Sequence, residues 1–376
     1  MTDEHHADRR SFLKTGAIAG TALVAGASDA FAEEDGSHGP TKGDIAILRF
    51  LSAVEQIESD LWQQYNELGG IQDSEVPGGS GSGAYTAALK NLDGDMDQYI
   101  HDNTEDEFSH HAFINAYLES IDAPQVDLSK FATLPSSKAT GANQIGRLTN
   151  LMQLTVDTSW WTRYRSRDKN PDLDPSFVFP QAVPTLNTGQ HPAIPRADND
   201  LSPKDHIQAI ANTAAFHFAS IEQGGSSLYP TLALKVTDPV VLRILLSIGP
   251  TETSHFQTWH DKAGNAVNTS PPLTDGTLVF PNLNVPPFPA PPPFGMEDFQ
   301  TNLIMPEPCP FLNRKFPPVS IIRPVSLSTK IFGAQQAVAG LKASGLFIGQ
   351  SAEFFTKVGK LAEEADEATR KCHRED

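Results

Sequence analysis

Two histidines in this chain of 376 residues each follow a glutamate by three positions: Glu107 pairs with His110, and Glu252 pairs with His255. On a helix, residues three apart project from one face, about one turn apart. A carboxylate oxygen and an imidazole nitrogen at that spacing can reach the same metal ion. A single pair fits equally well a solvent-facing glutamate beside a core histidine, but the second copy of the motif favours a metal site.

Each pair follows a second repeated segment, in which a Glu-Gln dipeptide precedes a leucine and an aromatic residue. Aligning Glu55 with Glu222 also aligns Leu61-Trp62 with Leu228-Tyr229. The chain therefore contains an internal repeat, and each half is predicted to contain a helix with one glutamate followed by a helix with Glu-x-x-His.

Two single glutamates and two Glu-x-x-His pairs on four helices resemble the ligand set of the ferritin-like superfamily. The most similar branch is that of exported ferritin-like domain proteins, which includes desiccation-related proteins. The resemblance covers residues 44–264 and implies two bound iron ions, or alternatively two manganese ions. In such a site Glu107 and Glu252 would bridge the ions, and the single glutamates would each cap one ion. The implied ligands are Glu55, Glu107, His110, Glu222, Glu252 and His255.

The single glutamates lie on otherwise apolar helix faces, which argues against ordinary surface positions. Glu55 shares its predicted face with Leu51, Val54 and Tyr65, and Glu222 follows Phe216, Phe218 and Ile221. An unpaired ion in a dry interior costs several kcal/mol, whereas two divalent cations would neutralise four carboxylates. Carboxylate and imidazole ligands without a thiolate favour iron or manganese, and suit zinc less well.

Three further residues lie beside the predicted ligands. Glu58 is one turn after Glu55 and is an additional ligand, a hydrogen-bond acceptor beside the ligands, or an exposed helix residue. Its counterpart in the second half is Gly225. Trp62 and Tyr229 follow the single glutamates by the same number of residues, and either pack around the core or relay electrons.

The pattern predicts an all-α chain built around a four-helix bundle. We expect an export signal at residues 1–32, a flexible leader at 33–43, the ferritin-like bundle at 44–264 with an elaborated crossover at 122–201, a proline-rich wrap or linker at 265–328, and a C-terminal helical tail at 329–376. The tail carries an apolar stripe that packs either against the bundle or against a second subunit, so a homo-oligomer is one of the alternatives.

Helix boundaries follow from capping residues and prolines. Ser202 and Asp238, each followed by proline, are expected to cap the third and fourth bundle helices. The third helix should stop before Pro230, and Pro250 should bend or restart the fourth helix while leaving its ligand pair on one turn. In the crossover, residues 139–167 are expected to be helical.

The N-terminus predicts export. Arg9 and Arg10 lie in a twin-arginine signature, followed by a weakly apolar run and by a small-residue cleavage site ending at Ala32. The apolar run is too short for a stable membrane span. We therefore expect a periplasmic or extracellular protein.

The net charge of -18 argues against nucleic acid as a partner. The two cysteines, Cys309 and Cys372, either pair or stay free. The resemblance implies redox chemistry with dioxygen or peroxide, by an oxidase, ferroxidase or peroxidase. The alternatives are a di-manganese catalase-like enzyme and a non-catalytic scaffold of the stress or desiccation-related kind.

Overall fold

The structure is a computed structural model that describes residues 39–76, 78–163, 180–283, 305–308, 315–316, 318–321 and 333–371. The predicted export signal, most of the leader and both cysteines lie outside the described residues. Every helix and strand among the described residues belongs to one compact unit, Pro40–Asp376. Within the described residues no helix is long and apolar enough to cross a membrane.

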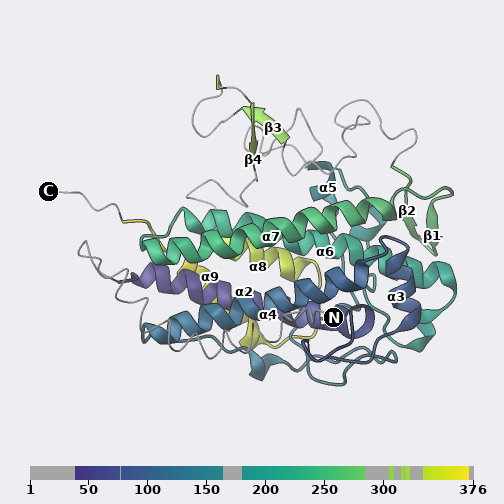
Figure 1. The fold of residues 1–376 in the computed structure, drawn as a ribbon, viewed down its shortest axis with the longest axis horizontal. Helices are drawn as coiled ribbons and strands as arrows, with labels where there is room; N and C mark the ends of the chain where they lie inside the picture. The colour runs from purple at the N-terminus through teal and green to yellow at the C-terminus, as the bar shows by residue number, and fades with distance from the viewer. Residues whose placement is uncertain are drawn as a thin grey trace, which may run out of the picture. The chain divides into compact units, whose positions relative to one another are not determined.

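Four long helices form the bundle, and they confirm the predicted all-α fold. They are α2 (Lys42–Gly69), α4 (Met96–Ser120), α6 (Lys204–Ala233) and α7 (Pro239–Ala266). Figure 1 shows α6 and α7 side by side, and α4 packs in the same way against α2. A short helix, α3 (Gly83–Lys90), leads into α4. Each half of the sequence repeat therefore contributes one packed pair of helices.

Side-chain caps begin two of the bundle helices. Asp238 accepts hydrogen bonds from the backbone amides of Val240 and Val241, as predicted for α7. At the start of α2, Thr41 and Asp44 form a reciprocal capping box. The prediction that Ser202 caps α6 was wrong, because the capping position is occupied by Pro203 and makes no side-chain bond.

Neither internal proline ends its helix. The prediction that α6 stops before Pro230 was wrong, since the helix continues to Ala233. Tyr229 and Leu232 flank the proline and are buried, so packing of this last turn offsets the backbone hydrogen bond that proline cannot make. Pro250 likewise lies inside a continuous α7, upstream of the Glu-x-x-His pair.

The described part of the crossover between α4 and α6 is mostly irregular, so the prediction of a helix at 139–167 was wrong for that part. There, only α5 (Ser159–Arg163) is α-helical, and residues 164–167 lie outside the described residues. Short 3₁₀ turns occur at η1 (Ser129–Phe131), η2 (Pro184–Asn187) and η3 (Asp198–Leu201).

A buried ion pair explains why this part of the crossover is not helical. Arg147 is fully buried, contacts Glu67 of α2 and donates to Ser136 Oγ at 2.9 Å. Its backbone forms an isolated bridge with Leu134. These tertiary contacts require extended backbone and override local helix propensity.

The described parts of the proline-rich segment include two short pairs of strands. β1 (Leu273–Asp275) and β2 (Leu278–Phe280) form an antiparallel hairpin around Gly276, whose φ of 58° suits the turn. A second pair joins β3 (Met305–Pro308) to β4 (Pro318–Ile321).

The tail forms two helices that pack on the bundle of the same chain. They are α8 (Gly333–Ala343), which packs against α6, and α9 (Ala352–Asp366), which packs against α2. Phe354, Val358 and Leu361 of α9 are buried. The apolar stripe read from the sequence is therefore used within the chain.

Asp366 connects the tail to the bundle, and its removal is the first testable change. Its carboxylate accepts from the amides of Ala334 and Gln335 at 3.0 and 2.9 Å and lies 3.3 Å from Lys235 Nζ. Asp366→Ala should lower the free energy of unfolding by about 2 kcal/mol, because it leaves buried donors unpaired. Urea denaturation measures the loss. Glu363→Ala, on the exposed side of the same helix, is the control, and an equal effect of both changes would contradict this role.

Candidate metal centre

The six residues predicted as ligands meet in the middle of the bundle, where all are buried or nearly so. They form two overlapping groups in which the ligand atoms lie within 4.8 Å of one another. Glu107 of α4 and Glu252 of α7 belong to both groups. The first group is completed by Glu55 and His110, and the second by Glu222 and His255. The two glutamates that the resemblance implies as bridges are therefore the two residues that the ligand groups share.

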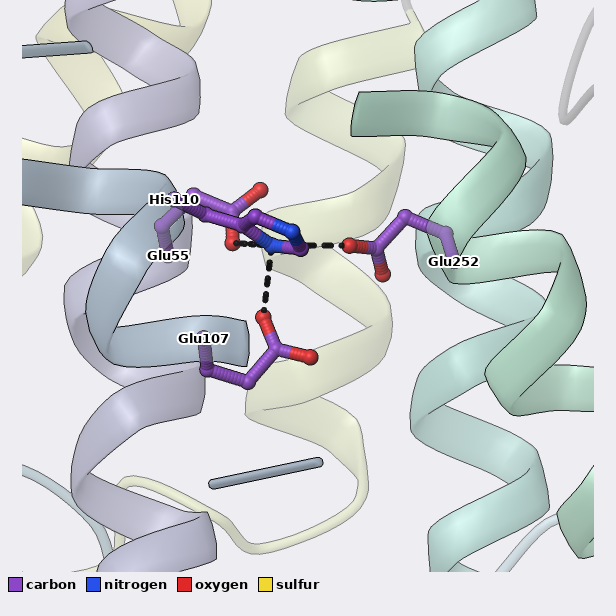
Figure 2. A group of neighbouring side chains, drawn as sticks. All are labelled: Glu55, Glu107, His110 and Glu252. Carbon is purple, nitrogen blue, oxygen red and sulfur yellow. Dashed lines mark hydrogen bonds and ion pairs between the residues drawn. The ribbon is translucent and has the colours of Figure 1, made fainter. Parts of the chain in front are cut away.

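His110 faces three carboxylates from three helices, as Figure 2 shows. Its Nδ1 atom lies 3.2 Å from Glu55 Oε2, 3.2 Å from Glu107 Oε2 and 3.3 Å from Glu252 Oε1. These four atoms surround one small space. The contacts bring together α2, α4 and α7, so the first ligand group depends on both halves of the chain.

His255 occupies the equivalent place in the second ligand group. Its Nδ1 lies 3.3 Å from both Glu107 Oε1 and Glu222 Oε2. On the other side of the ring, Nε2 lies 3.0 Å from Asp106 Oδ2. A carboxylate accepts, so Nε2 carries the proton of this bond. Such a carboxylate partner is the usual support of a metal-binding histidine, and it leaves Nδ1 directed at the ligand oxygens.

Several atoms of the cluster are buried without a hydrogen-bond partner. They are Oε2 of Glu222, both carboxylate oxygens of Glu252, and Nδ1 of His255. Leaving a buried polar atom unpaired costs about 1–3 kcal/mol, and native proteins rarely do so. These atoms point into the shared space and are types that bind iron or manganese. The residues present therefore fit a pair of divalent ions.

The single glutamates are held by aromatic residues of the opposite half. Trp62 Nε1 of the first half donates to Glu222 Oε1 at 2.9 Å. The hydroxyl of Tyr229, in the second half, donates a hydrogen bond to Glu55 Oε1. Trp62 and Tyr229 therefore do more than pack around the core: each orients a carboxylate of the other half.

Asn103 is a site residue that the sequence reading missed. Its amide nitrogen donates to Glu107 Oε1 at 2.9 Å and to Glu222 Oε1 at 3.1 Å. Its Oδ1 accepts from Trp259 Nε1 at 2.7 Å, which fixes the amide orientation. The signal that could have revealed it is its position one turn before Glu107 on the same helix face.

Glu58 is buried at 5% exposure, so its reading as an exposed helix residue was wrong. Among the described residues it belongs to neither central ligand group. Burial, together with the charges of Glu252 and Glu107, raises the pKa of Glu58 well above its usual value. In the metal-free protein this shift favours the protonated, neutral form of Glu58 beside the ligand cluster.

A cavity of about 190 Å³ borders Glu58. Its wall includes Val54, His217 and Gly225 from the bundle, and Leu341 from α8. His217 Nδ1 is 2.7 Å from the hydroxyl of Tyr65, and burial lowers its pKa to about 3. A neutral histidine and apolar side chains make this a mostly uncharged approach to the cluster.

The ligand cluster strongly perturbs the pKa values of its own members. Burial and the charge of Glu222 raise the pKa of Glu107 to about 7. Burial and the charge of Glu107 raise that of Glu252 well above its usual value. Burial alone would lower the pKa of His110, but the neighbouring carboxylates of Glu107 and Glu252 raise it. Without cations, protons therefore supply the positive charge that the buried carboxylates require.

Comparison with known families agrees with this architecture. Residues 43–264 match the model of the ferritin-like domain family, and the chain belongs to that family. Comparisons with curated proteins and with solved structures give no significant match.

Gly225 is required by the close approach of Glu252. A Cβ atom at Gly225 would lie 2.3 Å from Glu252 Oε2, whereas one at Gly224 would meet nothing within 4 Å. Gly225→Ala should therefore lower the free energy of unfolding by about 1–3 kcal/mol through overpacking. Gly224→Ala should leave it unchanged or raise it by up to about 1 kcal/mol. Urea denaturation compares these neighbouring substitutions, and equal effects would contradict the close approach.

The raised pKa of Glu107 predicts an unusual pH dependence of the metal-free protein. Because the folded pKa of about 7 exceeds the ordinary 4.5, Glu107 contributes stability that is fully present below pH 4.5 and is lost as the pH rises through 7. After chelator treatment, the wild type should therefore lose more stability between pH 5 and pH 8 than Glu107→Gln does. Urea denaturation at both pH values measures the difference, and parallel losses would show that Glu107 does not titrate in this range.

Proposed function

We propose that this ferritin-like protein binds two iron ions and catalyses a redox reaction with dioxygen or peroxide. The observation that carries the proposal is the pair of overlapping ligand groups that share Glu107 and Glu252. Four buried carboxylates and two imidazoles match the charge and ligand preference of two iron or manganese ions.

The contacts support the ligand roles that the resemblance implies. Glu107 and Glu252 would bridge the ions, with Glu55 and His110 completing one set and Glu222 and His255 the other. Two ferrous ions held by these side chains would supply the electrons, one from each ion, that reduce the oxidant. Trp62 and Tyr229 hold the two single glutamates in place from opposite halves.

The surrounding residues would control protons and access. Glu58 favours its neutral form in the metal-free protein and can hold a proton on its carboxyl oxygen beside Glu252. The cavity of about 190 Å³ next to it is large enough for dioxygen, peroxide or another small molecule. The apolar part of its lining, which includes Val54 and Leu341, would limit the entry of water and ions.

The proposed setting is outside the cytoplasm. The support is the twin-arginine signature around Arg9 and Arg10 and the cleavage site ending at Ala32. That route carries folded proteins, so a metal centre could be assembled before export. The net charge of -18 is compatible with binding of metal cations and argues against binding of nucleic acid.

Metal stoichiometry in four variants tests the centre. Glu107→Ala and Glu252→Ala each remove a residue common to both groups, so both ions should be lost or strongly weakened. Glu55→Ala and Glu222→Ala each remove a residue of one group, so about one ion per chain should remain. The measurement is metal analysis of each folded variant alongside Glu363→Ala, an exposed control. Full loading in all four would refute a dinuclear site.

Native metal content and activity separate the candidate functions. Two iron ions per chain, with consumption of dioxygen or peroxide that is lost in Glu107→Ala, would support the proposal. Two manganese ions with peroxide breakdown would favour the catalase-like alternative. A folded chain isolated without metal and unable to bind iron or manganese would favour a non-catalytic scaffold.

A further inference from the structure

A third group of metal-binding side chains lies away from the bundle centre, where the loop after α2 meets α4. Asp73 and Glu75 come from the loop and His101 from α4, and their ligand atoms lie within 4.8 Å of one another. The group shares no residue with the central groups. His101 precedes Glu107 by six positions, which corresponds to about 9 Å along a helix.

His101 is the member that points to a ligand. It is only 2% exposed, and its Nδ1 is buried without a hydrogen-bond partner. Its Nε2 is directed at Asp73 Oδ2, 3.6 Å away, and at Glu75 Oε2, 3.7 Å away. Both separations exceed a hydrogen bond. A buried imidazole normally has its polar atoms satisfied. Here the Nε2 edge of the ring faces Asp73 and Glu75 without a hydrogen bond to either carboxylate.

Another histidine of the chain shows what a direct ion pair looks like. His206 also contacts two acids, but its Nδ1 lies 2.7 Å from Asp275 Oδ2 and its Nε2 3.3 Å from Asp200 Oδ1. These contacts are hydrogen bonds. In contrast, one nitrogen of His101 faces both carboxylates at a wider spacing. Both separations, 3.6 and 3.7 Å, are too long for a hydrogen bond and lie within a few tenths of an ångström of the edge of a zinc tetrahedron, about 3.3 Å for metal–ligand bonds of about 2.0–2.1 Å.

The two carboxylate oxygens of Asp73 make different contacts. Its Oδ1 accepts the backbone amide of Glu75 at 2.8 Å, which forms a tight local turn. The other carboxylate oxygen of Asp73, Oδ2, is the one that faces His101. The side chains of Asp73 and Glu75 are 33% and 23% exposed, so solvent reaches the acids while the imidazole stays buried.

We propose that Asp73, Glu75 and His101 bind one divalent cation of the zinc class, independently of the central pair. An imidazole nitrogen with two carboxylate oxygens suits Zn²⁺, whereas Ca²⁺ and Mg²⁺ select oxygen ligands. Three protein ligands leave a coordination position for water on the exposed side. The bound ion fastens the loop after α2 to α4 and so connects two parts of the first half of the bundle.

Equilibrium dialysis of the full chain, with its own metals bound, against micromolar Zn²⁺ tests the site. The wild type should retain one more Zn²⁺ per chain than the double variant Asp73→Asn, Glu75→Gln, whose affinity should fall at least ten-fold. The Asp73→Asn change keeps a side-chain oxygen that can accept the hydrogen bond of the turn, and both acids are partly exposed, so this variant should fold. His101→Gln should lose the same equivalent. His206→Gln is the matched control and should bind like the wild type.

Two further readouts make the result decisive. Iron and manganese are measured in the same samples, so exchange of Zn²⁺ into the central pair is seen as loss of those metals. Zn²⁺ should also slow proteolysis of the loop in the wild type and not in the double variant. Equal Zn²⁺ retention by the wild type and the double variant would overturn the proposal. Displacement of the extra Zn²⁺ by equimolar Ca²⁺ would also overturn it, because it would indicate only an acidic patch.

Discussion

The repulsion among five glutamates buried in one region of the bundle is the constraint on which the rest of the structure depends. Glu55, Glu58, Glu107, Glu222 and Glu252 are all at most 5% exposed. Ionised together in a dry interior, they would destabilise the fold by several kcal/mol each. Two histidines and hydrogen-bond donors offset part of this cost, and the raised pKa values of Glu107 and Glu252 show that the offset is incomplete without further positive charge.

This constraint explains how the two halves are joined. Trp62 donates to Glu222 and Tyr229 to Glu55, so each half orients a carboxylate of the other. The repeat is nevertheless asymmetric around the bridges. Glu58 corresponds to Gly225, and the glycine makes room for the carboxylate of Glu252. In a fully symmetric site a glutamate would replace Gly225 and would collide with the carboxylate of Glu252. Only one half of the repeat therefore carries an additional carboxyl group, that of Glu58, beside the cluster.

The ligand pattern could be predicted from the sequence because helical periodicity encodes it locally. Glu-x-x-His needs only one helix turn, and its second copy distinguishes it from chance. Asn103 has no comparable repeat signal, since the equivalent position is Ile248. The crossover was mispredicted because Arg147 takes its conformation from Glu67, eighty positions away, and such a contact leaves no local trace. The same holds for His101, whose acidic neighbours come from a separate loop.

Segments outside the repeat determine how the cluster meets its surroundings. Val156 and Asp157 of the crossover and Ala337 and Leu341 of α8 border the cavity beside Glu58. The four bundle helices must hold their ligands in nearly fixed positions, because small displacements would leave buried charges unpaired. Residues of the crossover and α8 do not carry that restriction, so they can change the size and polarity of the approach without disturbing the ligands. For the proposed redox function, selectivity for the small molecule that reaches the cluster is therefore expected to reside in these appended segments, and the ligands of the metal ions in the repeat.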